Sequence, residues 1–277
     1  MGSNPIRCSN KTLYRVSDQL LRSLAHLSSL RSLWLVVPLA VSAMAALVLG
    51  YESPYLQRSV KFPRFLPLVS VDANVKPTLM QRVCVYAFVL LPWLIAYESV
   101  VRLGIPGSAL TTYTSFDNRV PVIQWTEAVY ASTYLVVLLT PVLLQRQCAL
   151  RRFATQALVA MVVVFPAFVL LPLVAPPRPF IATAPLGHLM QLERSLDSAA
   201  GAFPSFHVIW ACIAASVLGS ARGWKRYLWI AWAGLVAISC VTTGMHSVLD
   251  VVSGIVVYVF IAKLQFLWLD YPKPSKL

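Results

Sequence analysis

Charge is scarce in this chain, and acidic residues are the scarcest of the charged ones. Only 12% of the 277 residues are charged, 10 are Asp or Glu, and 58% are hydrophobic. The mean hydropathy is +0.71. Soluble domains usually carry about 25% charged residues. The shortage of charge therefore excludes an ordinary soluble domain and indicates a multi-pass integral membrane protein.

The lack of acidic residues leaves a formal net charge of +13, which by itself is compatible with a nucleic-acid partner. The 23 lysines and arginines mostly flank apolar segments, however, where such residues set topology and meet anionic lipid headgroups. We therefore expect the membrane to be a partner and expect no nucleic acid.

Cysteine is rare and shows no motif spacing. The five cysteines form no CxxC pair, and Cys84, Cys212 and Cys240 fall inside apolar segments, where a thiol is a small packing residue. This pattern excludes a disulfide framework and a cysteine-rich metal site. The acidic residues also lack the spacing of divalent-metal ligands. We expect no metal and no cofactor.

Long apolar runs are abundant, and no internal repeat accompanies them. A membrane-spanning helix needs about 20 apolar residues, and only helices or closed barrels satisfy the backbone inside a bilayer. Barrels show weak ten-residue alternation instead, so we predict an all-α integral membrane protein. The predicted apolar segments cover residues 32–51, 83–101, 124–144, 154–174, 207–221, 227–243 and 247–268.

The expected core is a six-helix transmembrane domain over residues 83–268. A basic segment, 1–31, comes first and is either an interfacial amphipathic helix or a basic tail. An additional N-terminal apolar segment and a basic loop follow over 32–82, and a short tail covers 269–277. Pro38 allows the N-terminal apolar segment to be kinked, so it either spans the bilayer or re-enters on one side.

The loop charges predict which face of the membrane carries the chemistry. Lysines and arginines are concentrated in loops that would share one side, near 52–82, 145–153 and 222–226. The positive-inside rule makes that side cytoplasmic. The polar breaks near His207 and His246 then lie on the extracytoplasmic side, which is periplasmic or lumenal.

Three polar stretches on that side hold candidate catalytic groups. His246 and Asp250 are four residues apart, so on a helix they share a face, and the carboxylate can fix the tautomer of the imidazole. His207 begins a helix, where free N–H groups favour an anion. Arg178 offers a planar fork suited to phosphate. Together these groups suit phosphoryl transfer. The stretches are APPRPF (175–180), GAFPSFH (201–207) and TTGMHSVLDVVSG (242–254).

PSFH at 204–207 and HSVLD at 246–250 resemble the second and third signature motifs of the type 2 phosphatidic acid phosphatase (PAP2) superfamily. That superfamily includes lipid phosphatases, lipid phosphotransferases and vanadium haloperoxidases. RP at 178–179 resembles the end of its first motif. DNRVPVIQWTEAVYASTYL at 117–135 resembles a stretch of the branch that contains the inositol phosphorylceramide synthases. The resemblance covers roughly residues 83–268 and implies the PAP2-type helical core.

Two cationic positions of the superfamily's phosphatase pattern are absent. The lysine of the first motif is Leu171 here, and the arginine of the third motif is Cys240. Sphingolipid-type phosphotransferases relax these positions while they keep a His–His–Asp set, which favours the phosphotransferase branch. The same absence argues against a haloperoxidase, whose vanadate needs these cations. Arg119 and Arg194 are possible substitutes in space.

The resemblance implies a two-step displacement. His246, oriented by Asp250, attacks phosphorus and forms a phosphohistidine. His207 protonates the leaving oxygen and then deprotonates the incoming hydroxyl. Arg178, Ser205 and N–H groups at the helix start would bind and stabilise the phosphate oxygens.

Each of these residues also has a structural interpretation. His246 and Asp250 would serve equally as a buried hydrogen-bonded pair that joins helices. Arg178 would serve as an anchor to lipid phosphates, and Ser205 as a helix cap.

Three acidic residues at or near apolar segments are further candidates for binding a lipid headgroup. Glu98 and Glu127 would bind hydroxyls of a polyol, because acids at such positions often have a function. They would alternatively pair with Arg102 or Arg119. Asp117 would shape a lateral entrance or, equally, a turn.

The expected protein is a membrane-embedded lipid phosphotransferase or lipid phosphatase, with the transferase favoured. Its substrate would be a phospholipid, a sphingolipid or a polyprenyl phosphate or diphosphate, and its acceptor water or the hydroxyl of a lipid or polyol. The alternative is a non-catalytic membrane protein that keeps the pocket for anionic headgroups. The missing cations support that alternative, and the intact His–His–Asp set argues against it. A transporter would show matching broken halves, and the sequence has no clear repeat.

Overall fold

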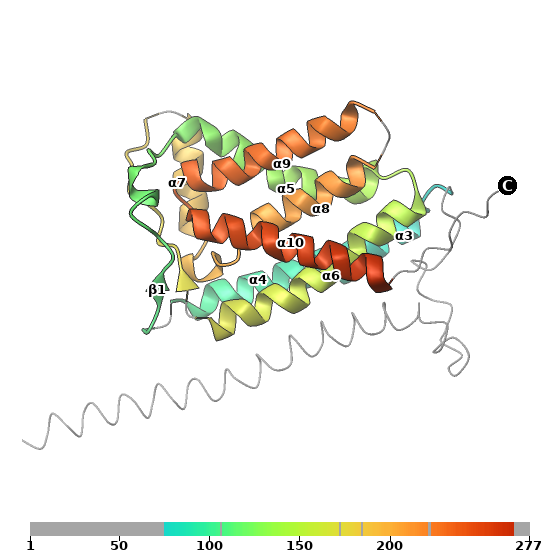
Figure 1. Ribbon diagram of the computed structural model, residues 1–277, viewed down its shortest axis with the longest axis horizontal. Helices are drawn as coiled ribbons and strands as arrows, with labels where there is room; N and C mark the ends of the chain where they lie inside the picture. Colours follow the sequence, from blue (N-terminus) through green and yellow to red (C-terminus); the bar gives the residue numbers. More distant parts are fainter. Residues whose placement is uncertain (1–74, 106, 172, 184, 221–222, 269–277) are drawn as a thin grey trace, which may run out of the picture. The chain divides into compact units, whose positions relative to one another are not determined.

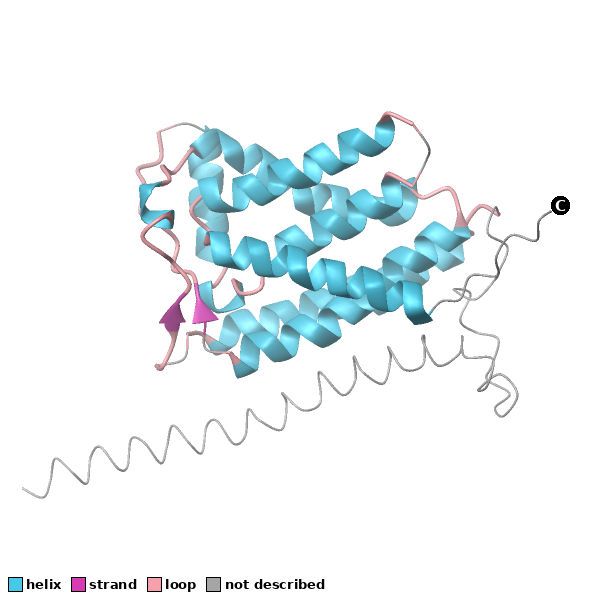
Figure 2. Ribbon diagram, in the orientation of Figure 1, coloured by secondary structure: helices cyan, strands magenta, loops and turns pink. Residues whose placement is uncertain are grey.

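A computed structural model describes residues 75–268, except 106, 172, 184, 221 and 222 (Figure 1). The described part is mostly helical, which confirms the predicted fold class at that level (Figure 2). The basic segment 1–31, the apolar segment 32–51 and the tail 269–277 lie outside the described residues, so what the sequence predicts for them stays a prediction.

Helices occupy every apolar range predicted for the core. Their ends differ from the predicted ends by several residues, and some helices begin before the apolar range while others end within it. The helix predicted to begin at residue 154, for example, begins at Gln147 and includes the charged pair Arg151 and Arg152. The observed bounds are Leu79–Val85 (α3), Tyr86–Leu90 (η2), Leu91–Leu103 (α4), Glu127–Leu143 (α5), Gln147–Leu170 (α6), Phe206–Leu218 (α8), Lys225–Thr242 (α9) and Val248–Trp268 (α10).

Within the described residues, 4 helical runs are long and apolar enough to cross a membrane. Phe206–Leu218 is also apolar but shorter. These runs support a membrane protein, while the number of spans and the sidedness of the loops stay predictions. The 4 runs are Leu79–Leu103, which joins α3, η2 and α4, Gln124–Leu143, Gln147–Leu170 and Val248–Gln265.

Helix α8 is the central helix of the described bundle. Helices α5, α6, α9 and α10 all pack against it, and residues along it such as Val208 and Ile213 are fully buried. Gly254 allows α10 to approach closely, because a Cβ atom there would lie 2.8 Å from the backbone oxygen of Ser205. The start of α8, with Ser205 and His207, is therefore held inside the bundle.

Short elements gather at the end of the bundle where α8 and α10 begin (Figure 1). Strands β1 (Leu110–Thr111) and β2 (Leu173–Val174) pair in parallel. Two-residue strands are too short to show a periodic pattern in the sequence. Residues 110–111 lie between predicted apolar segments, whereas residues 173–174 lie at the end of the predicted segment 154–174, where α6 already ends at Leu170. The other elements here are the 3-10 turns Asp117–Arg119 (η3), Gln124–Thr126 (η4) and Ala199–Gly201 (η5) and the helix Pro185–Leu196 (α7).

Candidate active site

The two histidines expected to carry the chemistry lie side by side. His207 is in the first turn of α8, and His246 is in the loop just before α10. Their ring centroids are 5.6 Å apart, and the residues are 7% and 4% exposed. The fold thus brings together two segments that the sequence separates and places both rings in one buried site.

Asp250 lies behind His246, although His246 precedes α10 instead of sharing a helical face with Asp250. It is in the first turn of α10 and is fully buried. Its Oδ2 atom is 3.7 Å from Nδ1 of His246 and accepts a 2.7 Å hydrogen bond from the Ser247 N–H group. Closure by roughly half an ångström would turn the histidine contact into a hydrogen bond. The carboxylate is therefore placed to orient the ring.

Ser205 faces His246 rather than its own helix. It occupies the N-cap position of α8, yet its side chain makes no capping hydrogen bond. Its Oγ atom lies 3.3 Å from Nε2 of His246, and its N–H group donates a 3.1 Å hydrogen bond to the backbone oxygen of Asp250. Because the first N–H groups of a helix have no partner within it, they favour an anion here. This geometry favours a role in the site over the capping role.

Both ring nitrogens of His207 contact tyrosine hydroxyls of α5. Nδ1 is 3.1 Å from the hydroxyl of Tyr130, and Nε2 is 2.8 Å from that of Tyr134. The Tyr134 hydroxyl in turn donates a 2.5 Å hydrogen bond to Glu193 of α7. The Tyr130 ring also stacks on the imidazole, with centroids 4.2 Å apart. Tyr130, Tyr134 and Glu193 are not among the site residues predicted from the sequence, although the two tyrosines lie one helical turn apart within the stretch 117–135.

Arg178 is buried, and its guanidinium group is engaged with the backbone. Nη1 donates to the carbonyl oxygen of Asp117 at 2.8 Å and to that of Val120, and Nη2 donates to that of Val241. The main-chain N–H group of Arg178 donates a 3.0 Å hydrogen bond to the carbonyl oxygen of Gly244. Arg178 therefore ties the loop before His246 to the segment after β1. Phosphate binding by this residue stays a prediction.

A second arginine holds the same loop. Arg194 of α7 donates from Nη1 to the carbonyl oxygen of Arg178 at 2.6 Å and from Nη2 to that of Thr243. Its guanidinium carbon lies 4.4 Å from the centroid of the Phe180 ring. Burial lowers the pKa of the Arg194 guanidinium. Of the two substitutes that the sequence offered, Arg194 reaches the site, whereas Arg119 is exposed.

Gly244 makes the turn that presents His246. Its φ of 72° is in the left-handed region, which favours glycine. Its carbonyl oxygen accepts a 2.9 Å hydrogen bond from the Tyr113 hydroxyl in addition to the Arg178 contact. Burial raises the pKa of Tyr113 to about 12, so this hydroxyl keeps its proton at neutral pH and remains a donor.

Asp117 connects the segment after β1 to the start of α10 through hydrogen bonds. Its side chain is fully buried. Oδ1 accepts a 2.7 Å hydrogen bond from the N–H group of Val248, at the start of α10. Oδ2 accepts from the N–H group and the hydroxyl of Thr114, at 2.7 and 2.6 Å. Burial acts to raise the pKa of Asp117, but these hydrogen bonds outweigh it and hold the pKa below its ordinary value. The contacts fit the turn role, and headgroup binding by Asp117 stays a prediction.

The two glutamates proposed for headgroup binding lie in different surroundings. Glu98 is exposed on α4. Glu127 is fully buried at the start of α5, and its carboxyl oxygens have no hydrogen-bond partner among the described residues. Glu193 and Arg194 are its charged neighbours. Among the described residues, no cluster of acidic, cysteine and histidine side chains is arranged to hold a metal ion.

Leu171 and Cys240 occupy the positions where the phosphatase pattern has a lysine and an arginine, and neither side chain carries a positive charge. Cys240 is fully buried, with its Sγ atom 4.0 Å from Oγ of Ser205. Leu171, just after α6, is 43% exposed. A small neutral thiol thus packs next to the serine where the phosphatase pattern has an arginine.

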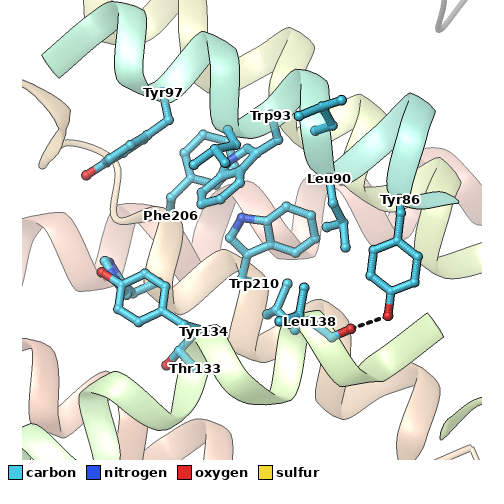
Figure 3. Close-up of a pocket in the computed structure, with 13 residues that line it drawn as sticks. Tyr86, Leu90, Trp93, Tyr97, Thr133, Tyr134, Leu138, Phe206 and Trp210 are labelled. Atoms are coloured by element: carbon cyan, nitrogen blue, oxygen red, sulfur yellow. Dashed lines mark hydrogen bonds between the residues drawn. The ribbon is translucent and has the colours of Figure 1, made fainter. Parts of the chain in front are cut away.

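An apolar cavity of about 370 Å³ leads away from His207. It lies between α4, α5 and α8, and aromatic rings form much of its wall (Figure 3). His207 and Tyr134 belong to the lining. The other lining residues are Tyr86, Leu90, Leu91, Trp93, Leu94, Tyr97, Thr133, Val137, Leu138, Phe206 and Trp210.

Comparison with known proteins identifies a family. A family model described as the PAP2 superfamily matches residues 92–264, which is more than half of the chain. The curated proteins and the solved structures contain no significant match. The matched range includes the His–His–Asp set and the tyrosines that contact His207. The match to the family model does not distinguish the branch of the inositol phosphorylceramide synthases from other branches.

Proposed function

Because the chain belongs to the PAP2 superfamily, we propose that it is a membrane-embedded enzyme that cleaves the phosphate ester of a lipid. The arrangement around His246 carries the proposal. Asp250 lies behind Nδ1, the Ser205 hydroxyl lies 3.3 Å from Nε2, and His207 lies beside the ring. A nucleophile, its orienting acid, a second proton carrier and an anion-favouring helix start are thus held in one buried place.

The first chemical step would be attack by Nε2 of His246 on phosphorus. Asp250 would keep the proton on Nδ1, so that Nε2 presents its lone pair. The bond between phosphorus and the leaving oxygen breaks, and His207 gives that oxygen a proton. In the second step His207 takes a proton from the acceptor hydroxyl, whose oxygen attacks the phosphohistidine and releases His246.

The phosphate oxygens would be stabilised mainly by uncharged donors. The Ser205 hydroxyl and the first N–H groups of α8 are next to Nε2 of His246, where negative charge develops in the transition state. Arg178 would join them through its buried Nε–H group, which has no hydrogen-bond partner among the described residues, or by exchanging carbonyl partners for phosphate oxygens. Its proposed contribution therefore includes holding the His246 loop as well as adding positive charge.

The cavity beside His207 supports a lipid as the substrate. Leu91, Leu94 and Leu138 line it and are 52%, 46% and 54% exposed on the outside of α4 and α5. An apolar cavity with exposed apolar edges suits a hydrocarbon chain that enters sideways from a bilayer. The phosphate of such a lipid would lie at the histidine end.

The acceptor decides between a hydrolase and a transferase, because the same residues activate water or an alcohol. We favour a transferase of the kind that the resemblance to inositol phosphorylceramide synthases implies, with a hydroxyl-bearing lipid or polyol as acceptor. The neutral Leu171 and Cys240 support this choice, because phosphotransferases of that kind relax the same two positions. The active site would face the extracytoplasmic side, in keeping with the basic loops at the other end of the helices.

Product analysis by mass spectrometry tests the proposal. Purified protein in nanodiscs would receive phosphatidic acid, phospholipids or polyprenyl diphosphate, each with and without ceramide or diacylglycerol. His246→Ala should lose all product formation. His188→Ala is the matched control, because His188 is an exposed histidine on α7. Free phosphate without an acceptor would indicate a phosphatase, and a new phosphodiester only with an acceptor would indicate a transferase. Wild-type rates in His246→Ala would refute the proposal.

A further inference from the structure

We propose that Tyr134 and Glu193 form a second histidine–acid unit with His207, in which Glu193 acts on the imidazole through the Tyr134 hydroxyl. These are positioning residues, and the inference rests on the proposed role of His207 as proton carrier. It gives His207 the kind of support that Asp250 gives His246, from a different helix and through a bridging hydroxyl.

The direction of the hydrogen bonds supports this unit. The Tyr134 hydroxyl donates its single hydrogen to Oε1 of Glu193 at 2.5 Å. Its oxygen is then free to accept from Nε2 of His207, which lies 2.8 Å away. A hydroxyl has one hydrogen to donate, so this arrangement places the hydrogen of a neutral His207 on Nε2. Nδ1, 3.1 Å from the Tyr130 hydroxyl, is left as the nitrogen that takes up and releases a proton.

His207 needs such a partner more than an exposed histidine would. The residue is 7% exposed, and burial disfavours the charged imidazolium form unless an acid lies nearby. Its ring nitrogens contact only tyrosine hydroxyls among the described residues. The ring of His246 also lies next to the ring of His207, and a positive charge on His246 would repel the imidazolium of His207. Glu193 is the acid connected to His207 by hydrogen bonds.

Other titratable groups around His207 come from several elements. On α5, Tyr130 and Tyr134 contact the ring directly, and Glu127 lies farther off, next to Glu193. Asp197, just after α7, accepts a 2.5 Å hydrogen bond from Tyr97 of α4. Asp250 faces His246 from α10. None of these acids is hydrogen-bonded to a hydroxyl that contacts His207 in the described part of the chain, which singles out Glu193.

The proton balance of the unit is simple. In the first step the imidazolium releases the proton of Nδ1 to the leaving oxygen and becomes neutral, with the hydrogen still on Nε2. In the second step Nδ1 takes the proton of the acceptor hydroxyl. Glu193 and the Tyr134 hydroxyl exchange no proton with the substrate in either step. The unit thus stabilises the charged form of His207 without being consumed.

Nuclear magnetic resonance of ¹⁵N-histidine in nanodiscs tests this without any substrate. The chain has 4 histidines, so the His207 signal can be assigned by its loss in His207→Gln. We expect wild-type His207 to carry its neutral hydrogen on Nε2. In Glu193→Gln the ring should gain its proton at a pH lower by about one unit or more. In Tyr134→Phe the hydrogen should no longer be confined to Nε2.

Glu98→Gln is the matched control, because Glu98 is an exposed glutamate on the neighbouring α4. It should leave the His207 signals unchanged, and thermal melting should show that all variants are folded. If Glu193→Gln and Tyr134→Phe both keep the wild-type tautomer and titration, the unit is only a tie between α5 and α7 and the inference is wrong.

Turnover provides the separate link to the proposed function. If the enzyme acts as proposed, the high-pH limb of kcat/KM should move to lower pH in Glu193→Gln, because His207 loses its proton earlier. The titration does not depend on turnover. If the wild-type protein forms no product, the proposed function is refuted. The histidine–acid unit is then still tested by the ¹⁵N-histidine titration.

Discussion

Replacement of Asp117 by asparagine should loosen the connection between the loop after β1 and the start of α10. The buried carboxylate accepts three hydrogen bonds, from Val248 N–H, Thr114 N–H and the Thr114 hydroxyl. An asparagine has one acceptor oxygen, so its NH₂ group must face at least one of these donors. Hydrogen bonds to charged groups contribute about 1.5–3 kcal/mol each, and an unpaired buried donor adds a penalty. We therefore expect a loss of about 2–4 kcal/mol in the free energy of unfolding.

Thermal melting in detergent or nanodiscs measures this loss. For a chain of this size, ~2–4 kcal/mol corresponds to a melting temperature lower by about 5–10 °C. Turnover should fall as well, because Val248 lies two residues after His246 and two before Asp250. Asn118→Ala is the control, since Asn118 is adjacent but exposed. It should melt within about 1 °C of wild type, as surface substitutions usually do.

The stabilising contribution of the Asp117 carboxylate should depend on pH in one direction. The pKa of Asp117 is below its ordinary value of 3.8, so its stabilising contribution is fully present above that value. The contribution is lost as the pH falls through the lowered pKa of the folded state. The melting difference between wild type and Asp117→Asn should therefore be constant near neutral pH and shrink as the pH falls below 3.8. Equal melting of the two proteins at pH 7 would refute this account of Asp117.

Four further substitutions test the site. Gly244→Ala should lower both melting temperature and turnover, because φ is 72° and the new Cβ would lie 3.1 Å from Cβ of Arg178; wild-type melting would contradict this. Ser205→Ala should lower turnover about 10–10²-fold with little change in melting, because its hydroxyl is not a helix cap. Asp250→Asn should lower turnover about 10²–10⁴-fold, which steady-state product release measures. Leu138→Trp should raise KM about tenfold for long-chain substrates and much less for short-chain ones, because it fills the cavity.

The sequence predicts the helices and the centre of the site because both have local signatures. Apolar runs mark the helices, and the four-residue spacing of His246 and Asp250 predicts that the two residues are near each other, although His246 lies just before α10. Ser205 and His207 are found from their position at the start of an apolar segment. That these two groups meet is implied by the family resemblance, since nothing in the local pattern brings α8 and α10 together.

The support around these groups depends on contacts that a single sequence does not reveal. Glu193 and Tyr134 are 59 residues apart along the chain, and α7 lies between the predicted apolar segments 154–174 and 207–221. Arg178 has the chemistry of a phosphate ligand, so the sequence cannot show that carbonyl groups surround it. Asp117 likewise fits either an entrance or a turn until its three donors are known. In each case the residue type is informative and its partners are set by the tertiary fold.

Direct detection of a phosphohistidine tests the central claim. Purified protein would be mixed with a radiolabelled lipid phosphate that turnover has shown to be a donor, quenched in alkali and digested for mass spectrometry. We expect an acid-labile, alkali-stable phosphate on the peptide that contains His246, with no label in His246→Ala. Turnover without any label on His246, or full activity in His246→Ala, would contradict the account.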